Sequence, residues 1–457
     1  MDRQWETRLE GMLAECEVSP RLWQNSEERL RQFVAPFTAL LSQQAQRKRA
    51  VEYVAGLVTD VKRKNVESIA YRHDQERGRL QHFIGCAQWD HQPLLNELAR
   101  QVGAEVGEAD GVIVFDPSGF PKQGKKSVGV ARQWCGRLGK VENCQVAVYM
   151  AYVSRKEHVL VNERLYLPQE WTNDRKRCKA AGVPKDVRFK TRHRLALDML
   201  KEQGRALPHR WVAGDDEMGK NAMFRRDLHE QGEQYLLAVP SNTLIRDLEA
   251  ALPEYQGRGA KPKQPFQRAD RWRDALPARA WTRVDVRDGE KGPLEVDVAG
   301  CRVVSRFAQR RMPYEETLVI VRSRDGANVT KYDFYLSDAP STMPKHEFAR
   351  VALAAHRIEE AIKRGKSETG LSHYEVRNWL GWHHHQALSL LATWFLTCET
   401  RLGKKIDTGH YVTPAPPRHR QTPPRCLAVR HTEQDRRLHI ASLDPQRASA
   451  ALSLQGM

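Results

Sequence analysis

GVIVFDPSGFPKQGKKS, residues 111–127, marks the point where the chain changes from helix-forming to strand-forming sequence. Residues 112–115 are apolar and rich in β-branched side chains, which is typical of a buried strand. Asp116 follows directly, and then come a Pro-Ser-Gly turn signal and a cluster of lysines. The stretch therefore predicts a strand that ends at a carboxylate, ahead of a positively charged loop.

Before this point, residues 1–108 are predicted to be helical. Apolar residues recur at three- and four-residue spacing in 26–44 and 47–64, interleaved with arginine and lysine. A further helix is expected over 92–103, ending at Gly103. These helices form either a DNA-contacting module or only a scaffold, and the basic residues favour contact.

After this point, strands alternate with helices. Three consecutive strands are predicted over 111–116, 144–154 and 158–168. They are followed in turn by a helix over 191–204, a strand over 210–216, a helix over 221–232 and a strand over 234–240. Hairpin-linked strands that pass into β-α-β alternation predict a mixed sheet with helices on its faces. Ligands of such sheets collect beyond the strand ends.

The second half of the chain begins with a basic, Gly- and Pro-rich stretch at 255–280, which indicates a linker or an exposed loop. Several strands are expected between 282 and 338, followed by a long helix over 344–366 and an apolar helix over 383–399. The segment beyond 401 has the composition of a flexible basic tail.

Composition narrows the class of protein. Lys plus Arg (74) exceed Asp plus Glu (57) by 17, and such an excess favours a polyanionic partner, most often nucleic acid, over a merely basic soluble protein. The eight cysteines include no CxxC pair, which argues against a zinc finger and a disulfide scaffold. No stretch reaches the ~20 apolar residues of a membrane span, and no secretion signal is evident. A cytoplasmic protein is expected.

Acidic residues follow two of the predicted strands and lie on the predicted helix over 344–366. Asp116 follows one apolar strand, Asp215 and Asp216 follow another, and Glu359 lies two helical turns before Lys366. Clustered carboxylates suit divalent cations such as Mg²⁺, which assist phosphodiester cleavage as a pair roughly 3.5–4 Å apart. Each acid also has a simpler reading, because an aspartate after a strand is often a turn former or helix cap.

Glu359 also has a simpler interpretation, as part of a charged helix face that pairs with Lys363.

A rival metal site is the histidine-rich segment with His373, His383, His384 and His385, whose imidazoles suit zinc or nickel. Consecutive helical residues point in different directions, so three adjacent histidines cannot share one ion. Packing or a DNA-facing surface is the preferred reading there.

Four stretches together resemble bacterial insertion-sequence transposases of the DDE type, the branch called DDE superfamily endonuclease. They are VIVFDPSGFPKQGKKSVGVARQWCGRLGKVENCQVAV, WVAGDDEMGKNAMFRRDL with YLLAVP, RIEEAIKRGKSETGLSHYEVRNWLGWHHHQALSLLA, and QHFIGCAQWDHQPLL. The resemblance runs in order from about residue 80 to 398. It implies a ribonuclease H-like catalytic domain in which two aspartates and a glutamate hold two Mg²⁺ ions, with Mn²⁺ as a substitute.

By position in these motifs, the implied metal ligands and catalytic residues are Asp116, Asp215 and Glu359, with Asp215 preferred to Asp216 and Glu359 to Glu360. Lys366 is implied to contact DNA phosphate, with help from Lys122, Lys125, Lys126 and Arg357. Related transposases carry a tyrosine and an arginine where this chain has Ala352 and Ala355. This departure affects phosphate contacts, which His356 or Arg357 partly replace, and removes no metal ligand.

The predicted fold is therefore α/β, a ribonuclease H-like mixed sheet flanked by helices. Its expected parts are an N-terminal helical DNA-binding domain (1–108), the first part of the catalytic core (109–254), a linker and β-rich insertion (255–340), the second part of the core with the glutamate helix (341–400), and a basic tail (401–457).

The predicted function is a transposase that binds the terminal inverted repeats of its insertion sequence, cleaves the ends and joins them to target DNA. The expected partner is double-stranded DNA, bound by a homodimer or larger assembly in the nucleoid-associated cytoplasm and not at a membrane. Two alternatives remain: a nuclease or resolvase of the same fold that does not transpose, and a non-catalytic DNA-binding derivative.

Overall fold

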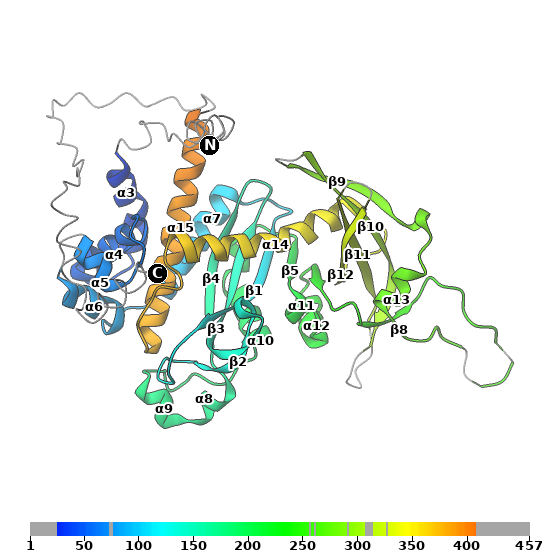
Figure 1. Cartoon of the computed structure of the whole chain (residues 1–457), viewed down its shortest axis with the longest axis horizontal. Coiled ribbons are helices and arrows are strands. Elements are labelled where there is room, and N and C mark those ends of the chain that lie inside the picture. The colour runs from blue at the N-terminus through cyan, green and yellow to red at the C-terminus, as the bar shows by residue number, and fades with distance from the viewer. Residues whose placement is uncertain are drawn as a thin grey trace, which may run out of the picture. The chain divides into compact units, whose positions relative to one another are not determined.

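The computed structural model describes residues 25–72, 76–255, 257–259, 262–289, 292–306, 314–325 and 328–407. Its helices alternate with strands after an all-helical N-terminal part (Figure 1). The helices are α3 (Ser26–Thr38), α4 (Gln44–Leu57), α5 (Val66–Arg72), α6 (Arg77–Gly85), α7 (Gln92–Val106), α8 (Gln169–Asn173), α9 (Arg175–Ala180), α10 (Arg192–Gln203), α11 (Asp216–Gly219), α12 (Ala222–Glu230), α13 (Ala269–Asp274), α14 (Lys345–Glu368) and α15 (Trp379–Asp407).

All strands belong to one large, mostly antiparallel sheet. They are β1 (Val112–Pro121), β2 (Ala131–Cys135), β3 (Lys140–Val153), β4 (His158–Tyr166), β5 (Trp211–Gly214), β6 (Tyr235–Ala238), β7 (Leu244–Asp247), β8 (Gln267–Arg268), β9 (Thr282–Gly289), β10 (Gly292–Ser305), β11 (Glu316–Asp325) and β12 (Asn328–Ser337). The order is β2-β3-β1-β5-β6-β12-β11-β10-β7-β8, with β4 also paired to β3 and β9 to β10.

Strand β1 is the centre of the first half of the sheet. It pairs antiparallel with β3 along its whole length and parallel with β5 over residues 112–115 only. β5 in turn pairs parallel with β6. Residues 112–115 are fully buried, as expected for a strand covered on both faces.

Strands β7 to β12 continue the same sheet, because β12 pairs antiparallel with β6. They enclose a small apolar core of their own, which includes Ile245, Trp272, Leu318 and Phe334. The expected mixed α/β class with helices on a large sheet is confirmed.

Helix α14 crosses the first half of the sheet and contacts β1, β3, β4 and β5 (Figure 1). Helix α15 packs on β4 and also on α4 and α6 of the N-terminal part. Among the described residues, none of the helices combines the length and the apolar character that crossing a bilayer requires.

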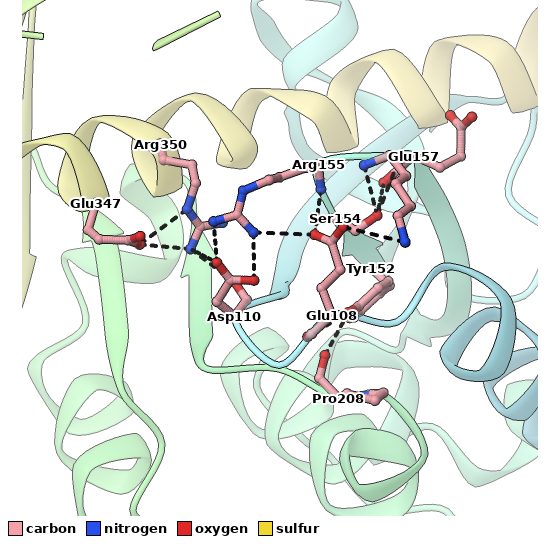
Figure 2. Close-up of polar contacts among 10 residues, drawn as sticks. Glu108, Asp110, Tyr152, Ser154, Arg155, Glu157, Pro208, Glu347 and Arg350 are labelled. Atoms are coloured by element: carbon pink, nitrogen blue, oxygen red, sulfur yellow. Dashed lines mark hydrogen bonds and ion pairs between the residues drawn. The ribbon is translucent and has the colours of Figure 1, made fainter. Parts of the chain in front are cut away.

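A polar clamp fixes the N-terminal half of α14 to the start of β1 (Figure 2). Arg350 donates to the Asp110 carbonyl at 2.9 Å and pairs with Glu347 at 2.9 Å, while Arg155 holds the Asp110 carboxylate through both guanidinium nitrogens. The same guanidinium group of Arg350 lies 3.8 Å from the Asp110 carboxylate. A carboxylate held by two arginines anchors the helix nine residues before Glu359.

A second, fully buried ion pair joins α12 to the later strands. Arg225 lies 2.7 Å from Glu316, and their side chains are 3% and 0% exposed. Ser305 and Tyr235 also bind this pair, at 2.8 Å from Arg225 and 2.7 Å from Glu316. A buried ion pair whose remaining donors and acceptors are hydrogen-bonded favours one arrangement of the helix and strands that carry it.

Three local expectations differ from the structure. Strand β1 does not end at Asp116 but continues to Pro121, since β3 pairs with it throughout and the β5 side is open beyond Phe115, where a proline costs no ladder bond. Helix α7 continues past Gly103 to Val106. The absent side chain of Gly103 instead makes room for the Ala206 carbonyl, which a Cβ would meet at 2.0 Å.

The third difference concerns residues 255–280, expected as a linker or exposed loop. This stretch contains α13, whose Trp272 is buried and donates its indole N–H to Asp247 at 2.8 Å. Helix α15 runs to Asp407 and therefore includes residues 401–407 of the predicted tail, whereas residues 408–457 lie outside the described part of the chain.

The clamp yields a stability prediction. Arg350→Met should lower the free energy of unfolding by about 1–3 kcal/mol, because it removes hydrogen bonds to a partly buried carboxylate and carbonyl. Arg364→Met is the matched control on the same helix, since Arg364 makes only a surface pair with Glu368 at 3.3 Å, worth under about 0.5 kcal/mol. Urea unfolding of the two variants measures the difference, and equal losses would contradict a clamping role.

Candidate active site

An open cleft of about 700 Å³ lies over the end of β5, the middle of β1 and the second half of α14. Asp116, Asp215 and Glu359 all line it, together with Lys366. These four residues come from three separate elements, and up to 250 residues separate them in sequence. The structure therefore brings the predicted acids and the predicted lysine to one place.

The two aspartates meet through strand register. Phe115 of β1 is the partner of Gly214 in the parallel β5, so the next residue of each strand, Asp116 and Asp215, projects from the same edge. Asp215 is also the N-cap of α11, and its Oδ1 accepts a hydrogen bond from the Met218 N–H at 3.0 Å. Asp215 can cap α11 and also face the cleft, because capping uses only one of its two carboxylate oxygens. Asp216 is exposed and is not among the residues that line the cleft.

Glu359 and Lys366 lie two turns apart on α14 and face the cleft together. The ammonium group of Lys366 donates to the Ser118 hydroxyl at 2.8 Å and lies 4.8 Å from the centroid of the Phe120 ring. Glu360 instead pairs with Arg357 at 2.6 Å. The neighbouring acid is therefore the one that is engaged elsewhere.

Two of the acids in the cleft have raised pKa values. Burial raises the pKa of Asp116 well above its usual value, and the negative charges of Asp215 and Glu359 raise it further. Burial also raises the pKa of Asp215 to about 6. Carboxylates in such a cluster either keep protons or share a cation, and oxygen donors of this kind suit hard divalent ions.

The other predicted phosphate contacts lie outside this lining. Lys122 donates to the Tyr374 carbonyl at 3.4 Å and sits 3.5 Å from the centroid of the Tyr374 ring, and burial lowers its pKa to about 8. Lys125 and Lys126 are exposed in the loop after β1, and Arg357 faces Glu360. Of the five predicted basic contacts, Lys366 is the one that lines the cleft.

The cleft also contains basic and aromatic residues that the sequence did not assign to DNA contact. Arg137, Lys363 and Arg192 add positive charge, and Arg192 pairs with Glu217 at 2.5 Å. Trp134 on β2 lines the cleft with 54% of its surface exposed. β2 is short and half exposed, so its signal is weak; an aromatic residue among basic ones in RQWCGR was the available hint.

The histidine-rich segment is mainly interior. The side chains of His383, His384 and His385 are buried and point to different partners, as the helical geometry requires. His384 contacts the carbonyls of Ile84 and Trp89, each at 2.9 Å, and His385 contacts the Tyr53 hydroxyl at 2.9 Å. Their separate partners agree with the expectation that the three do not share one ion, and His373 is among the residues that line the cleft.

Sequence comparison identifies known proteins that are similar to this chain. The chain is 29% identical over 204 residues to a probable transposase for insertion sequence element IS701 from Microchaete diplosiphon, which covers 42% of this chain. The match spans about half (49%) of that relative's length. Residues 36–293 match the family described as DDE superfamily endonuclease, a region that includes Asp116 and Asp215.

This match spans more than half of the chain and agrees with the resemblance seen in its motifs. Endonucleases of this family act on DNA and generally depend on divalent metal ions. The chain belongs to the DDE superfamily endonuclease family.

Proposed function

We propose that this protein is a DNA transposase, which binds the terminal inverted repeats of its insertion sequence, cleaves the ends and joins them to target DNA. The observation that carries the proposal is the convergence of Asp116, Asp215, Glu359 and Lys366 in one cleft. The relationship to a probable insertion-sequence transposase supports the substrate class.

The sheet supports a ribonuclease H-like catalytic core. Three antiparallel strands, β4-β3-β1, continue into the parallel strands β5 and β6. Asp215 follows β5 directly, and Asp116 is a partly exposed residue in the otherwise mostly buried β1. Strands β7 to β12 lie between Asp215 and Glu359 in sequence and extend the same sheet, as a β-rich insertion in such a core would.

The donor set fits divalent ions. Three carboxylates share one open cleft, and burial raises the pKa values of Asp116 and Asp215, with the charges of Asp215 and Glu359 adding to the effect at Asp116. Asp116, Asp215 and Glu359 would hold two Mg²⁺ ions, or Mn²⁺ in their place. When bound, such ions activate the attacking oxygen and stabilise charge on the leaving oxygen of a phosphodiester.

The remaining residues position the DNA backbone. Lys366 is held by Ser118 with its charge at the edge of the acid cluster, where it can neutralise a non-bridging phosphate oxygen. Lys363 and Arg137 enlarge this positive surface. They replace the predicted contacts of Lys122 and Arg357, which are engaged with Tyr374 and Glu360.

Joining distinguishes a transposase from a non-transposing nuclease. Purified protein is incubated with paired terminal repeats, a target plasmid and Mg²⁺, and the products are sequenced. A transposase yields end–target junctions, a resolvase-like nuclease yields cleaved ends alone, and a non-catalytic derivative binds ends without any effect of Mg²⁺. A homodimer or larger assembly on paired ends is expected, because two ends must be held together.

One cleavage prediction concerns Asp116, the acid within β1. Asp116→Asn should reduce end cleavage at least ~100-fold, since a lost metal ligand removes several kcal/mol of charge stabilisation. Asp216→Asn is the control, because Asp216 is exposed outside the cleft. Cleavage gels give the rates and gel-shift assays give end binding, which both variants should retain. Cleavage lost equally in both variants would be incompatible with this assignment.

A second prediction separates the two lysines. Lys366→Met should reduce cleavage about tenfold with little change in melting temperature, because one phosphate contact is lost. Lys122→Met should instead lower stability by about 0.5–2 kcal/mol, the worth of its contact with the Tyr374 ring, and should leave the cleavage rate of folded protein near wild type. The reverse pattern would place the phosphate contact at Lys122.

A further inference from the structure

A buried carboxyl group outside the cleft has no partner. Glu163 on β4 is 0% exposed, and neither of its carboxylate oxygens has a hydrogen-bond partner. The adjacent Arg164 does not satisfy it, since that guanidinium group binds Asn162, Gln92 and Glu202 and reaches only the Glu163 backbone carbonyl. An unpaired buried carboxyl is costly, and each such group in a folded protein requires an explanation.

Two imidazoles face this carboxyl group. The ligand atoms of His91, Glu163 and His383 all lie within 4.8 Å of one another. His91 is the N-cap residue of α7, Glu163 lies on β4, and His383 lies on α15. Three elements that are distant in sequence thus each contribute one metal-ligating side chain to a single point.

The protonation states suit a metal ion. The Nδ1 of His383 lies 2.9 Å from the Trp379 carbonyl, and because a carbonyl can only accept, Nδ1 carries the hydrogen and Nε2 keeps its lone pair. A second-shell carbonyl that orients the ligating imidazole is a regular feature of metal sites.

We propose that His91, Glu163 and His383 form a binding site for a zinc-like divalent cation. Two imidazoles and one carboxylate are a ligand set of zinc, which bonds nitrogen at about 2.0–2.1 Å and leaves a fourth position for water. In a tetrahedral site with these bond lengths the ligand atoms lie about 3.4 Å apart, so side-chain rotation has to draw together atoms that now lie within 4.8 Å of one another. His91 is partly exposed and provides the path of entry from solvent.

The ion has a structural role. It ties α7 to β4 and to α15, whose other buried histidines already hold the N-terminal helices through Tyr53, Ile84 and Trp89. None of the three ligands lines the cleft that holds Asp116. The site is therefore independent of the proposed function, and either proposal can fail alone.

The test uses the full chain with the cleft acids neutralised (Asp116→Asn, Asp215→Asn and Glu359→Gln), so that zinc cannot bind there. Chelator-treated protein is titrated with Zn²⁺ in excess Mg²⁺, and affinity and melting temperature are measured. This parent protein should bind one tight zinc ion and melt at a higher temperature with it. Zinc X-ray absorption should show two imidazole nitrogens and carboxylate oxygen.

Glu163→Gln in this background should weaken the tight site at least ~100-fold, more than typical second-shell losses, and abolish the zinc-dependent rise in melting temperature. The amide is nearly isosteric with a neutral carboxyl group, so the fold should persist, and His91→Gln gives a second test at a less buried position. Glu233→Gln is the matched control, because Glu233 pairs with His209 at 3.0 Å elsewhere and its loss should leave zinc binding unchanged.

Absence of a tight zinc ion in the parent protein would overturn the proposal, and so would equal zinc affinity in the parent and Glu163→Gln. A zinc spectrum without imidazole ligands would do the same. Histidines elsewhere in the chain contribute equally to all variants, so the difference between variants isolates this site.

Discussion

The parallel register of β1 and β5 is the constraint on which the cleft depends. Phe115 and Gly214 are partners, and β5 stops there, so Asp116 and Asp215, the residues that follow them, have no strand neighbour between them and line the cleft. Four fully buried residues of β1 before Asp116 fix this register, because a shift by one residue would exchange side chains between two faces that are each already closely packed. The repulsion between the acids is thus imposed by apolar packing beneath them.

The third acid arrives by a different route. Glu359 depends on the placement of α14, which the apolar face of that helix and the clamp at Asp110 determine jointly. The insertion between Asp215 and Glu359 must also return the chain to this point. The buried pair of Arg225 and Glu316 links α12, the second helix after Asp215, to β11, so the inserted strands are attached close to the second acid in sequence. Such a pair specifies an arrangement more than it adds net stability.

Much of this could be predicted from the sequence, since long periodic segments such as 344–366 and 144–154 became α14 and β3 with shifts of a few residues. The failures have a common cause in tertiary contact. Gly103 was predicted to end a helix, but its small size serves the close approach of Ala206. Pro117 and Gly119 were predicted to form a turn, but β3 pairs with them as strand residues. The sequence likewise could not reveal that Lys122, whose DNA contact stays a prediction, lies against Tyr374, which is 252 residues later in the chain.

The histidine-rich segment shows the same limit most clearly. Helical geometry correctly excluded one ion shared by His383, His384 and His385, but it could not reveal that His383 faces Glu163 and His91. Glu163 sits in an ordinary strand pattern, and only the packed structure shows that its carboxyl group lacks a partner. Both acid sites therefore follow one rule. A carboxylate that the fold holds partly or wholly away from water either keeps a proton or binds a cation, and the neighbours decide which kind of cation suits it: oxygen donors at Asp116 favour a hard ion, whereas imidazoles at Glu163 favour a zinc-like one.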